Sequence, residues 1–328
     1  MSQPESALVP PPEVAEDSAS AQERSQFLSS TTPRWCPGCG CFAVLKSLTA
    51  TYARLGVPRE KLVTISGIGC TSRLPYYTST YGFHTIHGRA PTVAMGVKLA
   101  NPDLSVWLIS GDGDALAIGG NHTMHLLRRN PDIKMLLLNN QIYGLTKGQA
   151  SPTSPQGLKT RSTPYGVADM PVNPVNLALA SGATFVARVP DTNTAMMESV
   201  FAAAHAHRGV AFVEVLLNCI TFHDGAYAMI TGKHSRDEHS LLLRPGEPMV
   251  YGKERRKVLV SDNGRIVSQV LGDDEAMPSH ALCHDPYVAD AGVAQQLALM
   301  ALPDTPCALG IFRQVDAPVY ALDQGLAG

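Results

Sequence analysis

Residues 105–114, Ser-Val-Trp-Leu-Ile-Ser-Gly-Asp-Gly-Asp, join an apolar, β-rich run to a turn with two carboxylates and two glycines. The run 105–110 predicts a buried strand, and a helix is expected around 115–129. Ligands of open α/β sheets bind beyond the carboxyl ends of the strands, where this turn lies. Gly111 and Gly113 allow close approach of the backbone to a ligand, and Asp112 offers a hard oxygen to a cation such as Mg²⁺.

Segments of two kinds alternate on both sides of this turn. Short apolar runs predict strands, and longer runs with apolar residues at helical spacing predict helices. Strands that are apolar throughout indicate a mostly parallel α/β sheet with helices on both faces. The expected strands are 61–66, 105–110, 134–138 and 210–217, and the expected helices are 42–54, 91–100, 115–129 and 194–208.

The texture of the sequence divides the chain into three parts. Residues 1–30 hold five acidic residues and one basic residue among Pro and Ser, which predicts a disordered or extended tail. Residues 31–225 carry the strand and helix pattern, and within them 144–174 form a long loop of the kind that is usually functional. Residues 226–328 have a weaker pattern, which we interpret as a small C-terminal extension that packs on another subunit.

Composition excludes several classes of protein. The 328 residues include 26 Lys and Arg against 28 Asp and Glu, so no basic excess is available for nucleic acid. Only 16% of residues are charged, against about 25% in ordinary soluble domains, which favours a surface covered by another subunit. No run reaches the roughly 18 apolar residues of a membrane helix, and seven scattered Cys do not resemble a disulfide scaffold. We therefore expect a cytoplasmic protein that does not bind membranes.

A second polar turn, Asn139-Asn140, follows the strand expected at 134–138. A right-handed crossover places this turn beside the first, so Asp112 and Asn140 are expected to converge on one Mg²⁺ ion together with a bound diphosphate. The chain has no G-x-x-x-x-G-K-[ST] loop, and Leu116 stands where a dinucleotide-binding fingerprint needs glycine or alanine. A P-loop or NAD site is therefore disfavoured.

Four cysteines form a second candidate site. Cys36 and Cys39 lie in the turn Trp-Cys-Pro-Gly-Cys-Gly before a helix, Cys70 ends Gly-Ile-Gly-Cys, and Cys219 follows the strand expected at 210–217. If the strands are parallel, Cys70 and Cys219 emerge at the same sheet edge as the diphosphate site. Four thiolates suit either zinc or an iron-sulfur cluster, and spacing alone leaves both open.

The span from Gly-Asp-Gly at 111–113 to Asn-Asn at 139–140 resembles the motif of thiamine diphosphate enzymes. The resemblance implies that Asp112, Asn140 and the main-chain carbonyl of Ile142 bind Mg²⁺. Further residues that it places at the cofactor are Gly111, Gly113, Asp114, Tyr143, Gly144, Leu145 and Thr146.

The thiamine motif, both cysteine motifs and the stretch 81–90 (YGFHTIHGRA) together resemble the β subunit of 2-oxoacid:ferredoxin oxidoreductases over about 32–224. The resemblance implies that Cys36, Cys39, Cys70 and Cys219 ligate one [4Fe-4S] cluster. Cys41 adds a thiol to the usual first motif, and whether it replaces a ligand stays open. Residues implied to border thiamine are Ile68, Gly69, Cys70, His87 and Gly88.

The reaction implied is the coenzyme A-dependent oxidative decarboxylation of a 2-oxoacid to an acyl-CoA and CO₂, with single electrons passing through the cluster to ferredoxin. The chain shows no candidate for the Glu that thiamine enzymes need, so activity is expected only with an α subunit, as αβ or α2β2. Lys147 is a candidate partner for the distal carboxylate of 2-oxoglutarate, and His87 is a candidate catalytic residue. Pyruvate or a broad range of 2-oxoacids, a thiamine decarboxylase or transferase with structural zinc, and a non-enzymatic regulatory subunit are the alternatives.

Overall fold

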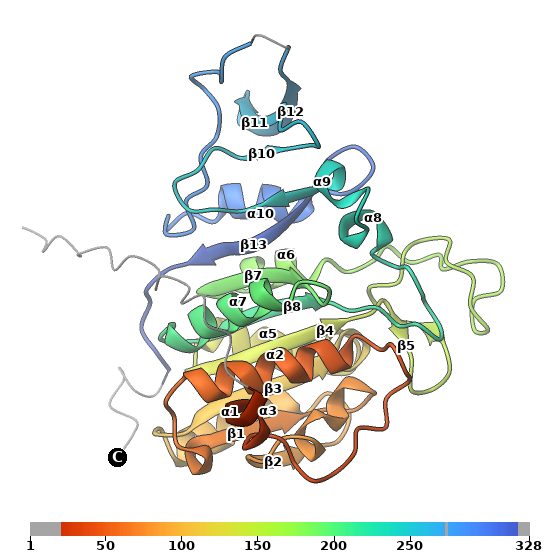
Figure 1. Cartoon of the computed structure of the whole chain (residues 1–328), viewed down its shortest axis with the longest axis vertical. Coiled ribbons are helices and arrows are strands. Elements are labelled where there is room, and N and C mark those ends of the chain that lie inside the picture. The colour runs from red at the N-terminus through yellow and green to blue at the C-terminus, as the bar shows by residue number, and fades with distance from the viewer. Residues whose placement is uncertain (1–20, 273–274, 321–328) are drawn as a thin grey trace, which may run out of the picture.

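The computed structural model describes residues 21–272 and 275–320, and an eight-stranded sheet forms its centre (Figure 1). The strand order is β2-β1-β3-β4-β8-β7-β13-β9, and the first six strands run parallel. The strands are β1 (Leu62–Ser66), β2 (Tyr81–His84), β3 (Ser105–Gly111), β4 (Ile133–Asn139), β7 (Phe185–Pro190), β8 (Ala211–Leu216), β9 (Ser240–Leu242) and β13 (Cys307–Gln314).

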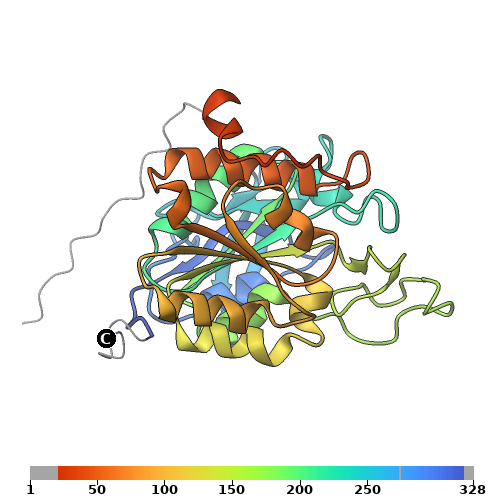
Figure 2. The ribbon, with the colours of Figure 1, turned by 90° about the horizontal axis from the view of Figure 1, so that it is seen from below.

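Helices cover both faces of this sheet, as the view along its edge shows (Figure 2). On one face, α2 (Cys41–Arg54) and α7 (Thr194–Ala206) bury an apolar cluster that includes Tyr52, Trp107 and Phe201. On the other, α3 (Ala90–Ala100), α5 (Gly120–Arg129) and α6 (Pro174–Ala180) pack over a cluster that includes Leu126 and Phe212. Because both faces are covered, β1, β4, β7 and β8 are buried along their whole length. The predicted α/β class is confirmed.

The loops that carry the predicted motifs meet at one edge of the sheet. β1, β3, β4 and β8 are parallel neighbours, so the segments that follow them emerge together at their carboxyl ends. These segments include η2 (Thr71–Tyr76) after β1 and the short pair β5 (Ile142–Tyr143) and β6 (Gln149–Ala150) after β4, whereas η1 (Arg59–Lys61) precedes β1 at the opposite edge.

One predicted helix is two helices. Instead of one helix over 115–129, α4 (Asp112–Leu116) ends early and α5 begins at Gly120. Gly119, between them, packs so tightly that a Cβ would lie 2.5 Å from the carbonyl oxygen of Asp114. The first turn therefore folds onto the site rather than continuing the helix. Sequence reasoning also missed β2, α6 and β7.

The boundary of the N-terminal tail was also wrong. Residues 1–20 lie outside the described part, but α1 (Ala21–Ser25) and the segment after it pack on the domain. Phe27 is buried, and its ring lies 6.0 Å from that of Tyr52. The backbone of Ser29 donates to Tyr77, and that of Ser79 donates to Phe27. The acidic and Ser-rich composition of this segment gave no indication that the Phe27 side chain packs in the core.

The C-terminal part joins the same sheet rather than forming a separate unit. β13 pairs antiparallel with β7, and β9 pairs parallel with β13. Leu297 and Phe312 are buried in the cluster under α6. The remaining elements are α8 (Ala228–Thr231), α9 (Arg236–His239), β10 (Val250–Tyr251), β11 (Lys257–Asp262), β12 (Arg265–Val270) and α10 (Gly292–Leu299). Within the described ranges, none of the helices combines the length and apolar character needed to cross a bilayer.

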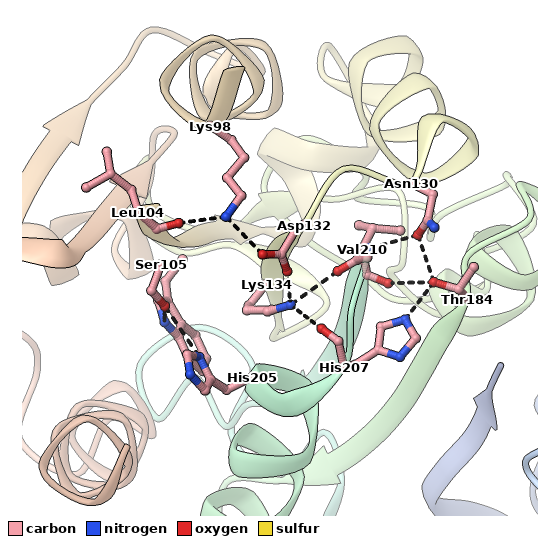
Figure 3. Close-up of polar contacts among 12 residues, drawn as sticks. Lys98, Leu104, Ser105, Asn130, Asp132, Lys134, Thr184, His205, His207 and Val210 are labelled. Carbon is pink, nitrogen blue, oxygen red and sulfur yellow. Dashed lines mark hydrogen bonds and ion pairs between the residues drawn. The ribbon is translucent and has the colours of Figure 1, made fainter. Parts of the chain in front are cut away.

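The amino edge of the sheet carries a buried polar network (Figure 3). Lys134 donates to Asp132 at 2.5 Å and to the carbonyl oxygens of His207 (2.6 Å) and Gly209 (3.2 Å). Lys98 contacts the other oxygen of Asp132 at 2.9 Å. Burial opposes ionisation, but the Lys134 and Lys98 ammonium groups lower the pKa of Asp132. Each ammonium group in this network has hydrogen-bond partners.

A hydroxyl completes that network. Thr184 Oγ1 lies 2.8 Å from Asn130 Oδ1 and 2.7 Å from His207 Nε2 (Figure 3). Burial, together with Lys134, lowers the pKa of His207 to about 4. His207 is therefore neutral at physiological pH and serves as a structural hydrogen-bonding group.

Candidate active site

A cavity of about 380 Å³ opens where β1, β3 and β4 end. Its wall is made by the loops after these three strands, as the sequence motifs predicted. The predicted residues that line it are Ile68, Gly69, Cys70, His87, Gly111, Asp112, Gly113, Asp114, Asn140, Ile142, Tyr143, Gly144, Leu145 and Thr146. Gly88 does not line the cavity, although it directly follows His87, which does.

Asp112 lies at the base of this cavity and is only 2% exposed. Its Oδ2 accepts hydrogen bonds from Ser151 Oγ (2.5 Å) and Thr153 Oγ1 (2.6 Å). Burial raises the pKa of Asp112, and the two hydroxyls act in the opposite direction. A buried carboxylate that faces a cavity suits a cation, because an unpaired charge is costly to bury.

The two asparagines of the Asn-Asn turn point in different directions. Asn140 lines the cavity and its Oδ1 accepts from the backbone N–H of Ile142 (3.2 Å). Asn139 lies behind the cavity, where its Nδ2 donates to Glu214 Oε1 at 2.7 Å. Gln141 between Asn140 and Ile142 has a φ of 57°, a left-handed conformation that lets the chain turn sharply here. The turn therefore presents Asn140 to the cavity and buries Asn139.

Asp114 holds the loops of the cavity together. Its two carboxylate oxygens accept from the backbone N–H of Gly88 (2.8 Å) and from Ser110 Oγ (2.7 Å). A Cβ at Gly67 would lie 1.8 Å from Oδ2 of Asp114, so only glycine fits there. The Gly88 contact explains how that residue supports the cavity without lining it.

Tyr143 closes one side of the cavity over Gly113. A Cβ at Gly113 would lie 2.2 Å from the Tyr143 ring, and the Tyr143 hydroxyl donates to the Gly113 carbonyl oxygen at 3.2 Å. The second glycine of the Gly-Asp-Gly motif is therefore required by packing against an aromatic ring.

A second cavity, of about 250 Å³, contains the four predicted cysteines. Cys36 and Cys39 precede α2, Cys70 follows β1, and Cys219 follows β8, and all four line this cavity together with Cys41. Burial, together with the charges of Cys39, Cys219 and Cys36, raises the pKa of Cys70 to about 11. The four thiols therefore face the same cavity.

The fifth thiol of the cavity has a different place. Cys41 is fully buried at the start of α2, and its hydrogen bond to Cys39 lowers the pKa of the Cys39 thiol to about 7. The other two cysteines, Cys283 and Cys307, lie in the C-terminal part and do not line the cavity. Among the described residues, no three His, Cys, Asp or Glu side chains are grouped closely enough to hold a metal ion as they stand.

The two cavities meet at Gly144. Cys70, Asn140, Gly144 and Leu145 line both cavities. A Cβ at Gly144 would lie 3.5 Å from the sulfur of Cys219 and 3.8 Å from that of Cys70. The absence of a side chain at this position leaves the sulfurs next to the first cavity.

In the part of the chain that the structure describes, the cysteine cavity has basic side chains and no acidic ones in its wall. Arg34, Arg73 and Lys147 line it, and no Asp or Glu does. Within the described ranges none of these three cations forms an ion pair with a carboxylate. Such a wall favours an anionic occupant, and thiolate-bound metal centres are anionic.

The two candidate substrate or catalytic residues, His87 and Lys147, line different cavities. His87 is exposed at the first cavity, whereas Lys147 is exposed at the cysteine cavity, with a φ of 78°. His84 does not line either cavity, since its Nδ1 faces Ser66 Oγ and the Ser72 carbonyl oxygen, both at 3.1 Å.

Sequence reasoning missed the residues behind the cation site. Ser151 and Thr153 stand in the loop after β6, and Glu214 is a central residue of β8 whose Oε2 accepts from Arg188 Nε at 2.6 Å. A buried Glu and Arg in neighbouring strands are the signal that was available, because such charges occur inside proteins only in pairs.

The chain has relatives of known name. Residues 67–215 match the family model "Thiamine pyrophosphate enzyme, C-terminal TPP binding domain". The chain is 46% identical over 302 residues to the 2-oxoglutarate oxidoreductase subunit KorB of Mycobacterium tuberculosis, covering 91% of this chain and 80% of that protein. It is 46% identical over 190 residues to the β subunit of the 2-oxoacid:ferredoxin oxidoreductase 1 of Aeropyrum pernix, covering 58% of this chain and 60% of that protein.

A solved structure is also similar. The 2-oxoglutarate:ferredoxin oxidoreductase of Magnetococcus marinus, with 2-oxoglutarate, coenzyme A and succinyl-CoA bound, superposes with a TM-score of 0.73 at 34% identity, covering 93% of this chain and 88% of that one. The resemblance drawn from the cysteine and thiamine motifs is confirmed. The chain belongs to the β-subunit family of the 2-oxoacid:ferredoxin oxidoreductases.

Proposed function

We propose that this chain is the thiamine diphosphate-binding β subunit of a 2-oxoglutarate:ferredoxin oxidoreductase, active with an α subunit and with coenzyme A as co-substrate. The observation that carries the proposal is the meeting of the two cavities at Gly144. One is lined by the thiamine motif and the other by four cysteines. The KorB relative and the Magnetococcus enzyme carry 2-oxoglutarate in their names.

Residues of the first cavity fit a cation and a diphosphate. Asp112, Asn140 and the carbonyl oxygen of Ile142 would hold Mg²⁺, since carboxylate, amide and carbonyl oxygens are its preferred ligands. Gly144 brings the backbone to the wall without a side chain, which leaves space for phosphate oxygens. Thiamine diphosphate, when bound, supplies the carbon nucleophile that attacks the ketone of a 2-oxoacid.

The second cavity fits an iron-sulfur cluster. Cys36, Cys39, Cys70 and Cys219 would hold [4Fe-4S], and Arg34 and Arg73 would balance the negative charge of the thiolates. The cluster, when bound, accepts single electrons and passes them to ferredoxin, which zinc cannot do. Cys41, buried behind Cys39, would leave ligation to the other four.

Metal and cofactor analysis of the anaerobically purified αβ complex tests the proposal. We expect a brown protein with about four irons per β subunit, absorbance near roughly 400 nm that dithionite bleaches, and bound thiamine diphosphate. A colourless complex with zinc would favour the decarboxylase or transferase, and a complex without thiamine diphosphate would favour a regulatory subunit.

Lys147 is the candidate for substrate choice. Its ammonium group would pair with the distal carboxylate of 2-oxoglutarate, a charge that pyruvate lacks. Lys147→Ala is expected to raise KM for 2-oxoglutarate about tenfold or more and to leave KM for pyruvate nearly unchanged, because a charge-assisted hydrogen bond contributes about 1.5–3 kcal/mol. Lys147 lines the cysteine cavity. Equal effects of the substitution on KM for both substrates would exclude the pairing and favour a pyruvate or broad-range enzyme.

A further inference from the structure

The turn Ser151–Ser154 lies directly behind the cation site. Ser151, Thr153 and Ser154 are 6%, 2% and 1% exposed, which is unusual burial for three hydroxyl residues in a loop. Two of the hydroxyls, those of Ser151 and Thr153, meet the same oxygen of Asp112, at 2.5 and 2.6 Å. Neither residue belongs to the motifs that identified the site.

Within the turn these two hydroxyls make only longer contacts, from Ser151 Oγ to Thr153 Oγ1 (3.3 Å) and to Ser154 Oγ (3.4 Å). Ser154 closes the turn, because Ser154 Oγ accepts from the Ser151 N–H at 2.8 Å and donates to the Gln141 carbonyl oxygen at 2.6 Å. The backbone N–H of Ser154 also donates to the Ser151 carbonyl oxygen at 3.0 Å. The hydroxyls of Ser151 and Thr153 are therefore available to act on Asp112.

Thr153 also reaches the first asparagine of the Asn-Asn turn. Its Oγ1 lies 2.8 Å from Asn139 Oδ1, so its single proton is shared between that amide oxygen and Asp112 Oδ2. Asn139 Oδ1 also accepts from the Gln141 N–H at 3.1 Å. The orientation of the Asn139 amide is fixed from behind, because its Nδ2 donates to Glu214. One hydroxyl thus lies between two side chains from neighbouring strand ends, Asp112 after β3 and Asn139 at the end of β4.

That anchor is itself rigid. Glu214 pairs with Arg188 in the neighbouring strand β7, and the two side chains are 2% and 8% exposed. A buried, doubly bonded carboxylate has little freedom to move. Because Glu214 holds the Asn139 amide in place, the contact with Asn139 restrains Thr153 relative to the sheet.

We propose that Thr153, supported by Ser151, is a positioning residue that holds the Asp112 carboxylate ready for Mg²⁺ and the diphosphate. The inference rests on the proposed function, because it assigns the cation site to Asp112. Hydrogen-bonding partners of metal ligands typically change metal affinity by about 10–100-fold when they are removed. Ser151 shares the task, so its loss has the smaller effect.

The test measures binding of Mg²⁺, titrated at saturating thiamine diphosphate, to the complete αβ complex by calorimetry, together with the thermal unfolding midpoint. Thr153→Val keeps the shape and removes the hydroxyl, and we expect Mg²⁺ to bind at least tenfold more weakly. Thr153→Ser restores the hydroxyl, and we expect binding within about threefold of wild type. Ser151→Ala is expected to weaken binding less than Thr153→Val does, and it provides a second reading if Thr153→Val does not fold.

Thr184→Val is the matched control. Thr184 is 4% exposed, and its hydroxyl is bonded to Asn130 and His207 at the opposite edge of the sheet. We expect Thr184→Val to lower the unfolding midpoint and to leave Mg²⁺ affinity unchanged. If Thr153 had only a structural role, Thr153→Val would give this same result.

The outcomes separate the two proposals. Wild-type affinity in both Thr153→Val and Ser151→Ala, or failure of Thr153→Ser to restore binding, overturns the positioning role while the proposed function stands. A wild-type complex that binds neither Mg²⁺ nor thiamine diphosphate overturns both.

Discussion

The two edges of the sheet use buried charge in opposite ways. At the amino edge, Lys98, Asp132 and Lys134 satisfy one another and the surrounding carbonyl groups. At the carboxyl edge, Asp112 is more deeply buried than Asp132 but has only hydroxyl and backbone partners, and burial raises its pKa. The same strands connect both edges, so the difference arises from the loops. One edge is built for stability and the other retains an unneutralised carboxylate for a ligand.

The largest test of this contrast is Lys134→Met at the amino edge. Met fills similar volume but leaves Asp132 with a single ammonium partner and leaves two carbonyl groups without their donor. We expect the free energy of unfolding to fall by about 3 kcal/mol, because two buried carbonyl groups lose their hydrogen-bond donor, each at a cost of about 1–3 kcal/mol. Denaturant unfolding measures this. Unchanged stability would show that the network does not support the fold.

Asp112→Asn is the counterpart at the carboxyl edge. We expect binding of Mg²⁺ and thiamine diphosphate to weaken by at least about 100-fold, since the charged ligand is lost. The stability of the cofactor-free protein should stay the same or rise by about 1 kcal/mol, because the variant no longer buries a carboxylate without a cation. A large loss of stability in the absence of cofactor would contradict the contrast between the edges.

Acid should weaken the amino edge through His207. Its pKa of about 4 in the folded chain lies below the ordinary value of 6.5, so the unfolded state takes up the proton first as pH falls. We expect stability to decline by about 2 kcal/mol between roughly pH 6.5 and 4 from this residue. Burial also lowers the pKa of His205 and of His284, which adds to the decline. Unfolding midpoints across this pH range should therefore fall less steeply in His207→Gln than in wild type.

An exposed ion pair gives the smallest effect and calibrates the others. Arg244 and Glu247 lie 3.7 Å apart, with side chains 57% and 51% exposed. Because solvent screens such pairs, Arg244→Ala should change the free energy of unfolding by about 0.5 kcal/mol or less. A change as large as that of Lys134→Met would mean that burial does not separate the two classes of charge.

Sequence alone predicted the α/β class, four strands of the sheet, both motif clusters and the family, because these depend on local patterns. Most residues of β3, β4 and β8 are apolar, which made these strands recognisable. The polar exceptions are Ser105, Ser110, Lys134, Asn139 and Glu214. The gathering of four cysteines followed from parallel strands that end at one edge.

Other features depend on contacts between distant segments and left little local signal. The anchoring of Phe27 on Tyr52 is a single apolar contact within a polar segment. The hydroxyl contacts of Ser151 and Thr153 with Asp112 join residues about forty positions apart through a loop without regular structure. The split between α4 and α5 is set by the packing of Gly119 against the turn rather than by helix propensity.

The position of β13 has a consequence for shortened forms of the chain. Cutting after residue 225 would remove both β13 and β9 and would leave β7, buried along its whole length, as a bare apolar rim. Unpaired strands of this kind recruit other chains and aggregate. The catalytic motifs all precede the cut, yet the fragment that carries them would precipitate rather than work alone.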